Sequence, residues 1–127
     1  MGKLIVVVDD DTTILSLVEL VLRRYQYNVM TLEDPLQALD LLDSLSPDLF
    51  ILDIMMPRIS GIELCKRIRA HPRTRHVPII ILSAFGVADG FVKGLEAGAD
   101  VFVPKTGLSR DLVTSVHQLL NTTADVG

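Results

Sequence analysis

Short apolar runs and amphipathic stretches alternate along the whole chain. Five of the apolar runs are rich in Val and Ile and are mostly continuous rather than interrupted at every second position. Continuous runs of this length are typical of strands that are buried on both faces of a parallel sheet. The pattern therefore predicts five strands, over residues 4–8, 28–32, 49–53, 77–82 and 100–103.

The segments between these runs place apolar residues at helical spacing. Asp34 followed by Pro35, and Ser60 followed by Glu63, have the spacing of helix starts, so helices are expected after both. Three apolar stripes are predicted to face the sheet: Ile14, Leu17, Val18, Val21 and Leu22; Leu36, Leu39, Leu42 and Leu45; and Leu112, Val113, Val116, Leu119 and Leu120. Strands that alternate with helices in this way predict a doubly wound α/β domain with helices on both faces of the sheet.

The helix expected over residues 87–97 should be the least stable one. It contains Gly90 and Gly94, and each glycine costs about 1 kcal/mol relative to alanine inside a helix. Gly98 is a candidate for its C-terminal cap. We therefore expect Gly90→Ala and Gly94→Ala to raise stability; the alternative is that these glycines only allow close packing.

Composition agrees with one globular domain and excludes several classes. The chain has 127 residues, 49% of them hydrophobic, and a formal net charge of −4. This charge gives no general reason to bind nucleic acid or to lie on a membrane surface. Cys65 is the only cysteine, no signal peptide is apparent, and no apolar run is long enough to span a bilayer. A soluble cytoplasmic protein is expected.

The residues at the predicted strand ends carry a coherent chemistry. In a doubly wound sheet, ligands bind outside the carboxyl ends of the strands. Carboxylates at this edge suit Mg²⁺, which keeps several waters and also takes oxygens from a phosphoryl group. A hydroxyl and a lysine opposite the metal would hold the remaining phosphoryl oxygens. The candidates are Asp9, Asp10 and Asp11 after the first strand, then Asp53, Ser83 and Lys105.

The order of these residues resembles the receiver domain of two-component response regulators, from about Lys3 to Asn121. The resemblance rests on Asp9-Asp10, on the segment from Leu52 to Pro57 with Gly61 after it, on Ser83-Ala84, and on Ala97-Gly98-Ala99-Asp100 leading to Lys105. It implies a flavodoxin-like three-layer sandwich with strand order 2-1-3-4-5 and five helices. It also implies a receiver domain over residues 1–122, with 123–127 as a polar tail or the start of a linker.

The resemblance assigns a role to each position. Asp53 would accept a phosphoryl group from a sensor histidine kinase or a histidine phosphotransfer protein, and Ser83 and Lys105 would contact its oxygens. Asp10 would bind Mg²⁺ directly, Asp9 would act through metal-bound water, and the backbone carbonyl of Met55 would complete the protein ligands. The domain would catalyse only its own phosphorylation and dephosphorylation, and it would act on a downstream output domain or protein, with a phosphorylation-dependent dimer as one form.

Four further positions refine this interpretation. Asp11 has no family role and is expected to cap the first helix. Phe102 stands where the family has a switch aromatic coupled to Ser83, and it lacks a tyrosine hydroxyl. Met55 and Phe85 are apolar where the family tunes hydrolysis, which predicts slow self-dephosphorylation. Thr106 follows Lys105 where the family usually has proline, so the isomer of the Lys105–Thr106 peptide bond is left open.

Other functions also fit parts of the sequence. The series Asp9, Asp11 and Thr13 also fits the first motif of haloacid-dehalogenase-like phosphatases, with Asp9 as nucleophile, but that reading leaves Asp53 unexplained. A degenerate receiver that serves only as a docking module, and a flavin-binding domain, are weaker alternatives. The three histidines, His71, His76 and His117, lack metal-ligand spacing and are expected to lie at the surface without a catalytic role.

Overall fold

Five parallel strands form one sheet in the order β2-β1-β3-β4-β5. The computed structural model describes residues 2–84 and 94–126. The strands are β1 (Leu4–Val8), β2 (Asn28–Leu32), β3 (Leu49–Asp53), β4 (Ile79–Ser83) and β5 (Val101–Pro104). The predicted sheet and strand order are confirmed. Strand β4 begins later than expected because Pro78, which has no N–H for the ladder, precedes it.

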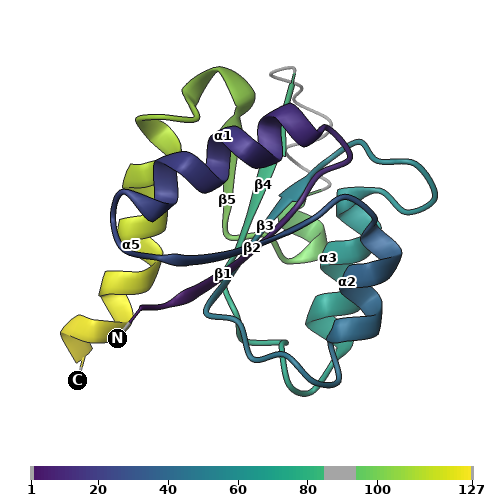
Figure 1. Ribbon diagram of the computed structural model, residues 1–127. Helices are drawn as coiled ribbons and strands as arrows, with labels where there is room; N and C mark the ends of the chain where they lie inside the picture. The colour runs from purple at the N-terminus through teal and green to yellow at the C-terminus, as the bar shows by residue number, and fades with distance from the viewer. Residues whose placement is uncertain (1, 85–93, 127) are drawn as a thin grey trace.

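Helices cover both faces of this sheet (Figure 1). They are α1 (Thr12–Arg23), α2 (Pro35–Leu41), α3 (Gly61–Ala70) and α5 (Asp111–Val126), with a short 3₁₀ helix, η1, at Lys105–Gly107. Residues 94–97 are also helical and belong to the helix predicted over 87–97. Phe85 and Gly90 lie outside the described residues. No helix within the described ranges is long and apolar enough to cross a membrane.

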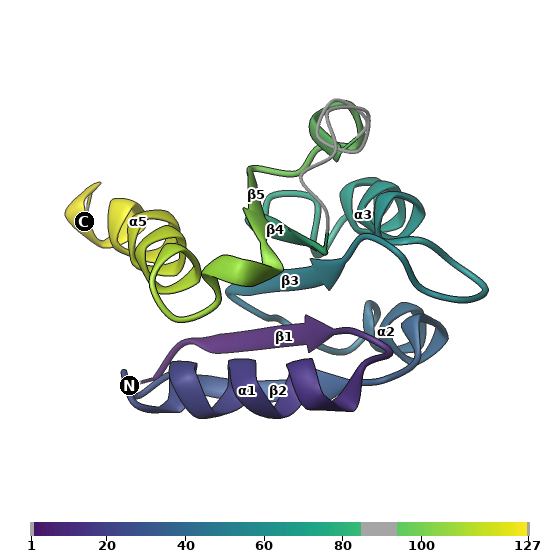
Figure 2. The ribbon, with the colours of Figure 1, turned by 90° about the horizontal axis from the view of Figure 1, so that it is seen from above.

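The sheet divides the core into two layers, as the view from above shows (Figure 2). Helices α1 and α5 pack on one face against the odd-numbered residues of β1 and β3, such as Val7 and Ile51. Helices α2 and α3 pack on the other face against even-numbered residues such as Val6 and Leu52. This alternation follows from the two-residue period of a strand. Because both faces are covered, the strands have the continuous apolar runs that predicted them.

The predicted helix starts are confirmed by their hydrogen bonds. The Asp11 carboxylate accepts hydrogen bonds from the N–H groups of Thr13 and Ile14 at 2.9 and 3.4 Å. Asp34 accepts from the N–H of Leu36 at 3.0 Å, and Ser60 Oγ accepts from the N–H of Glu63 at 3.2 Å. Each side chain satisfies a backbone donor that has no partner within its helix.

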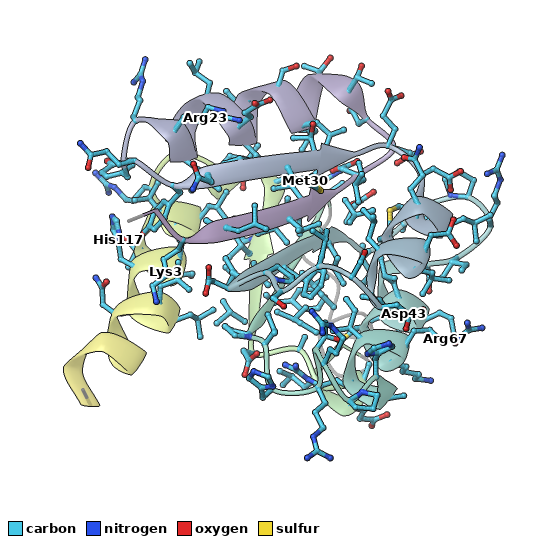
Figure 3. The ribbon with its side chains drawn as sticks, turned by 60° about the horizontal axis from the view of Figure 1, so that its bottom comes forward. Lys3, Arg23, Met30, Asp43, Arg67 and His117 are labelled. Carbon is cyan, nitrogen blue, oxygen red and sulfur yellow. The ribbon has the colours of Figure 1, made fainter. Side chains whose placement is uncertain are left out.

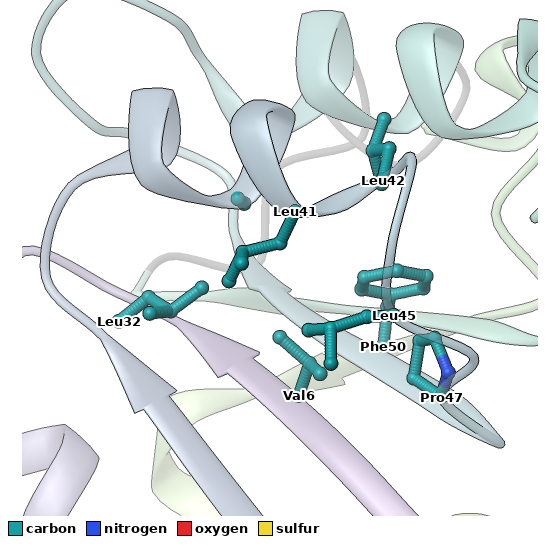
Figure 4. A pocket seen from close by; sticks show the side chains of 8 residues that line it. Val6, Leu32, Leu41, Leu42, Leu45, Pro47 and Phe50 are labelled. Atoms are coloured by element: carbon teal, nitrogen blue, oxygen red, sulfur yellow. The ribbon is translucent and has the colours of Figure 1, made fainter.

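Two of the predicted apolar stripes are partly wrong. On α1, Leu15 is buried with Val18 and Leu22, whereas Leu17 is 42% exposed. Helix α1 has apolar residues on both sides of Val18, so either side could continue the stripe. The sheet buries the side that carries Leu15 and leaves the side with Leu17 exposed. On α2, Leu36 is also exposed, whereas Ala38 is buried in the core layer that contains Val6 and Phe50. Figure 4 shows the apolar pocket beside this helix, which is lined by Val6, Leu41, Leu42, Leu45 and Phe50.

Helix α5 continues through Val126. Residues 123–126, which were expected to form a polar tail or linker, therefore continue the backbone of the last helix. The domain boundary at residue 122 stays a prediction.

The Arg69 guanidinium joins three segments at the edge of the sheet opposite to the strand ends. It donates hydrogen bonds to the carbonyls of Gly98 at 2.9 Å, Arg75 at 3.0 Å and Val77 at 2.5 Å, and it pairs with Asp100 at 2.9 Å. Asp100 in turn accepts from the N–H of Ile79 at 2.8 Å. This set of bonds, the Arg69 cluster, ties the end of α3 to the starts of β4 and β5.

Replacing Arg69 should therefore cost more stability than replacing a neighbouring arginine. Arg69→Met keeps the aliphatic stem but removes the hydrogen bonds, and we expect a loss of about 1–3 kcal/mol in urea unfolding. Arg67→Met is the matched control, because Arg67 projects from α3 (Figure 3) and its side chain is 55% exposed. An exposed pair with Glu63 contributes at most about 0.5 kcal/mol. Equal losses in the two variants would contradict the role of the Arg69 cluster.

Candidate functional site

The residues predicted to form the site lie together at the carboxyl ends of the central strands. Asp53 is the last residue of β3 and Ser83 the last residue of β4. Asp9 follows Val8, which pairs with Leu52 in the parallel ladder. The register therefore places these groups on neighbouring strands at one edge of the sheet. Parallel strands force this convergence because all their carboxyl ends point the same way.

Three carboxylates form an acidic cluster at this edge. Asp9, Asp10 and Asp53 each offer an oxygen, and these oxygens lie within 4.8 Å of one another. Asp9 is fully buried and Asp53 is 4% exposed, whereas Asp10 faces solvent. Buried like charges at such distances repel strongly, so the cluster requires positive charge nearby.

Lys105 supplies one positive charge. Its Nζ lies 3.0 Å from Asp9 Oδ2 and 3.1 Å from Asp53 Oδ1, so one ammonium bridges β1 and β3. Burial opposes the charged form of Lys105, but its interactions with Asp9 and Asp53 outweigh burial, and the net effect raises its pKa. The ammonium therefore stays charged in the site. The sequence predicted that Lys105 lies beside the carboxylates but not that it pairs with Asp9.

The two oxygens of Asp9 have different partners. Oδ1 accepts a hydrogen bond from the N–H of Asp11 at 2.9 Å, which holds the carboxylate against the backbone at the start of α1. Oδ2 is buried and accepts no hydrogen bond from any described residue, although Lys105 is close enough to form an ion pair. A buried carboxylate oxygen without a hydrogen bond is the position at which a cation or its bound water would be accommodated.

The environment raises the pKa of both buried carboxyls. Burial is the largest cause for Asp53, the neighbouring Asp9 charge adds to it, and Lys105 opposes both, so the pKa of Asp53 rises to about 6. Burial also raises the pKa of Asp9, against the opposing effects of the Asp11 N–H and Lys105. Lys105 alone therefore does not offset the cost of burying both charges.

The backbone around Asp53 is held by close contacts. The N–H of Ile54 donates to Leu82 O at 2.9 Å, and the N–H of Gly61 donates to Ile54 O at 2.9 Å. A Cβ on Gly61 would collide with the Asp53 carbonyl oxygen, so only glycine allows α3 to begin this close to the strand end. The Met55 side chain between these contacts is 70% exposed, whereas Met56 is buried.

The remaining predicted residues lie as follows. Ser83 is buried, and the strand register pairs it with Pro104, directly before Lys105. Phe102 lies on β5 opposite Ile81. No peptide bond in the described ranges is cis, so the Lys105–Thr106 bond is trans, and Lys105 reaches both carboxylates from this backbone.

His71 and His117 form side-chain hydrogen bonds away from the strand ends. His71 Nε2 lies 2.7 Å from Asp43 Oδ1, and Tyr27 Oη lies 2.7 Å from His117 Nδ1. Neither residue belongs to the acidic cluster, which is the one group of metal-ligating side chains found in the described part of the chain. Cys65 is fully buried, and burial raises its pKa to about 11, as expected for a small core residue rather than a nucleophile.

These observations fit a divalent, oxygen-binding cation. All side-chain donors in the cluster are carboxylates, one of them exposed to water, which is the ligand set that Mg²⁺ prefers. The Asp9 oxygen without a hydrogen bond and the uncompensated charge of the cluster point to the same ligand. The site as a whole thus combines a cation position, a buried carboxylate and an ammonium around one edge of the sheet.

Comparison with known proteins identifies the class. The sequence profile of the response regulator receiver domain matches residues 5–117, so the chain belongs to this family. Family membership sets the phosphatase-like interpretation of Asp9, Asp11 and Thr13 aside. It also agrees with the sheet order, since the receiver domain protein from Methanospirillum hungatei superposes with a TM-score of 0.88, at 28% identity and with 100% of each chain covered.

The chain is similar to parts of two regulators of transcription. It is 37% identical to the phosphate regulon transcriptional regulatory protein PhoB of Pseudomonas aeruginosa, over 97% of this chain and 54% of PhoB. It is 42% identical to the transcriptional regulatory protein CpxR of Escherichia coli K12, over 91% of this chain and 48% of CpxR. The chain therefore spans about half the length of these relatives.

A magnesium-bound structure is also similar. The receiver domain of a sensor histidine kinase from Pseudomonas aeruginosa PAO1, with a magnesium ion coordinated in its active-site cleft, superposes with a TM-score of 0.87. It is 26% identical, and the match covers 95% of this chain and 99% of that one.

The raised pKa of Asp53 gives a testable dependence of stability on pH. Folded Asp53 keeps its proton up to about pH 6, whereas the unfolded chain releases it near 3.8. Between these values the folded state binds more protons, so the free energy of unfolding should fall as pH rises from about 4 to about 6 and stay low above that. Asp53→Asn removes the charge, so it should raise stability without magnesium by about 1–3 kcal/mol at neutral pH, with a smaller gain below about pH 4.

Urea unfolding across this pH range checks the expectation. Asp40→Asn on the exposed face of α2 is the matched control, and it should change stability little at any pH. A gain for Asp53→Asn that is the same at every pH would show that the buried charge is not its cause.

Proposed function

We propose that this domain accepts a phosphoryl group on Asp53 in a magnesium-dependent reaction. The observation that carries the proposal is the pairing of Asp53 Oδ1 with Lys105 Nζ beside the three-carboxylate cluster. An Asp53 carboxylate oxygen attacks the phosphorus of a phosphohistidine, the P–N bond breaks, and an acyl phosphate forms. The donor is a histidine on a sensor kinase or a phosphotransfer protein.

Magnesium would be held by Asp10, Asp53 and the Met55 carbonyl, with Asp9 acting through metal-bound water or by positioning. When bound, the ion supplies positive charge to the phosphoryl oxygens. The fully buried position of Asp9 and the exposed position of Asp10 support this division, because an exposed carboxylate can reach the ion from the solvent side.

Lys105 and Ser83 would hold the phosphoryl oxygens. The Lys105 ammonium already lies 3.1 Å from Asp53 Oδ1 and can follow the added charge, and Ser83 ends the strand next to β3. Phosphorylation adds negative charge at the buried Asp53 carboxylate, so it attracts Lys105 and Ser83 more strongly. Movement of these two side chains would change the surface of the domain next to them. The exposed Met55 is apolar and cannot orient an attacking water, which favours slow self-dephosphorylation.

The proposed activity is self-modification in the cytoplasm rather than turnover of a separate substrate. The output would be a second domain or protein that recognises the changed surface, with a phosphorylation-dependent dimer as one form. PhoB and CpxR are named as transcriptional regulators and are about twice as long, which supports an output of that kind outside the matched region. The domain itself is proposed to make no contact with nucleic acid.

Labelling with acetyl phosphate tests the acceptor. With Mg²⁺ and acetyl phosphate, intact mass should show one added phosphoryl group on wild type and none on Asp53→Asn. Asp9→Asn is the second arm, and it should slow labelling without removing the acceptor. Label that persists in Asp53→Asn but is lost in Asp9→Asn would favour Asp9 as nucleophile, and no label on any variant would favour a docking module.

Magnesium should stabilise the fold, because it offsets the repulsion among the carboxylates. At a magnesium concentration ten times the Kd, we expect unfolding to cost about 1.4 kcal/mol more than without metal. Asp10→Asn should lose most of this increment, while Asp40→Asn should keep it. Thermal melts in calcium-free buffer, with either magnesium or EDTA present, measure the effect. An unchanged melting temperature of wild type at high magnesium would contradict the proposed metal site.

A further inference from the structure

Gly94 lies directly against the ring of Phe102. A Cβ built on Gly94 would lie 2.5 Å from Phe102 Cε1, 3.2 Å from Cδ1 and 3.4 Å from Ile81 Cδ1. The first of these distances is too short for two carbon atoms, so the aromatic ring occupies the space that any larger residue at position 94 would need. The geometry contradicts the expectation that Gly94→Ala raises stability.

The backbone does not explain this glycine. Gly98, four residues later, has a φ of +107°, which side chains adopt rarely, but Gly94 does not lie in that region. Residues 94–97 are helical, and Leu95 and Ala97 within them carry side chains without difficulty. Inside a helix glycine is less favourable than alanine. Space for the ring is therefore the structural reason for glycine at this position.

Phe102 shares a face of the sheet with Ser83. Ile79, Ile81 and Ser83 alternate along β4, so their side chains point to the same face. Ile81 pairs with Phe102 and Ser83 pairs with Pro104 across the β4–β5 ladder. Ile81 and Phe102 pack in the core layer that also contains Ala97. The ring therefore lies between Gly94 and Ile81, and Ser83 follows Ile81 as the next residue on the same face of β4.

We infer that Gly94 is a positioning residue, which places the Phe102 ring and, through it, sets the response of Ser83 to the phosphoryl group. The inference rests on the proposed function and adds a regulatory contact to the same site. A ring excluded from the space at Gly94 has two other places to go, along the face toward Ser83 or outward to solvent. Either displacement changes the packing beside Ser83 and Lys105.

Stability measurements test the contact itself. In the wild-type background, Gly94→Ala should lower the urea midpoint because the methyl group displaces the ring. In a Phe102→Ala background the same substitution should raise the midpoint, since the methyl group then enters free space and alanine favours the helix. If Phe102→Ala does not fold, Phe102→Leu, which lacks Cε1, takes its place. The same sign of change in both backgrounds would overturn the inference.

Labelling with acetyl phosphate tests the effect on the site. Gly94→Ala should change the rate of Asp53 labelling by about threefold or more, as expected for coupled residues in contact, and the change should vanish when Phe102 is also replaced. Leu95→Ala, at the 44% exposed neighbour, is the control and should leave the rate unchanged. An unchanged rate in Gly94→Ala, or a change that persists without Phe102, overturns the inference. Failure of the proposed function would show differently, as the absence of label on wild type.

Discussion

The Lys105 ammonium between Asp9 and Asp53 is the contact on which the site depends. It joins a buried carboxylate that follows β1 to one that ends β3, and Lys105 itself follows β5. The carboxyl ends of these strands must therefore lie close together. One ammonium faces three carboxylates, and ionisation of all three would leave two negative charges uncompensated. Breaking a buried pair leaves an unpaired charge inside the fold, so each of these residues constrains the others.

The fold keeps this charge cluster in place by contacts that lie outside it. Parallel pairing aligns the strand ends, and Gly61 lets α3 begin against the Asp53 carbonyl without a gap. At the opposite edge the Arg69 cluster fixes where β4 and β5 begin. Positions at both ends of the strands are thus set by packing and hydrogen bonds. These contacts outside the acidic cluster offset the electrostatic cost of burying its charges.

Much of this could be predicted from sequence because it depends on local or periodic signals. Buried parallel strands leave continuous Val and Ile runs, and caps such as Asp34 need only the next few residues. The acidic site was predicted because topology alone brings strand ends together. The exposed side of Leu17 and the contacts of Arg69 were missed, since each depends on how far neighbouring elements approach. The Asp9–Lys105 pair likewise depends on the path of the chain after β5.

Gly94 shows the same limit in its clearest form. Helix propensity, a local property, favours alanine there, but the Phe102 ring eight residues later in the chain occupies the space. The contact joins a helical segment to a strand, so neither the helical nor the strand periodicity of the sequence predicts it. Gly61 and Gly94 are alike in this respect, because each lets another part of the chain approach. One of them packs against the backbone of Asp53 and the other against the face that holds Ser83, so both glycines bring helical segments into direct contact with the strands that carry the site.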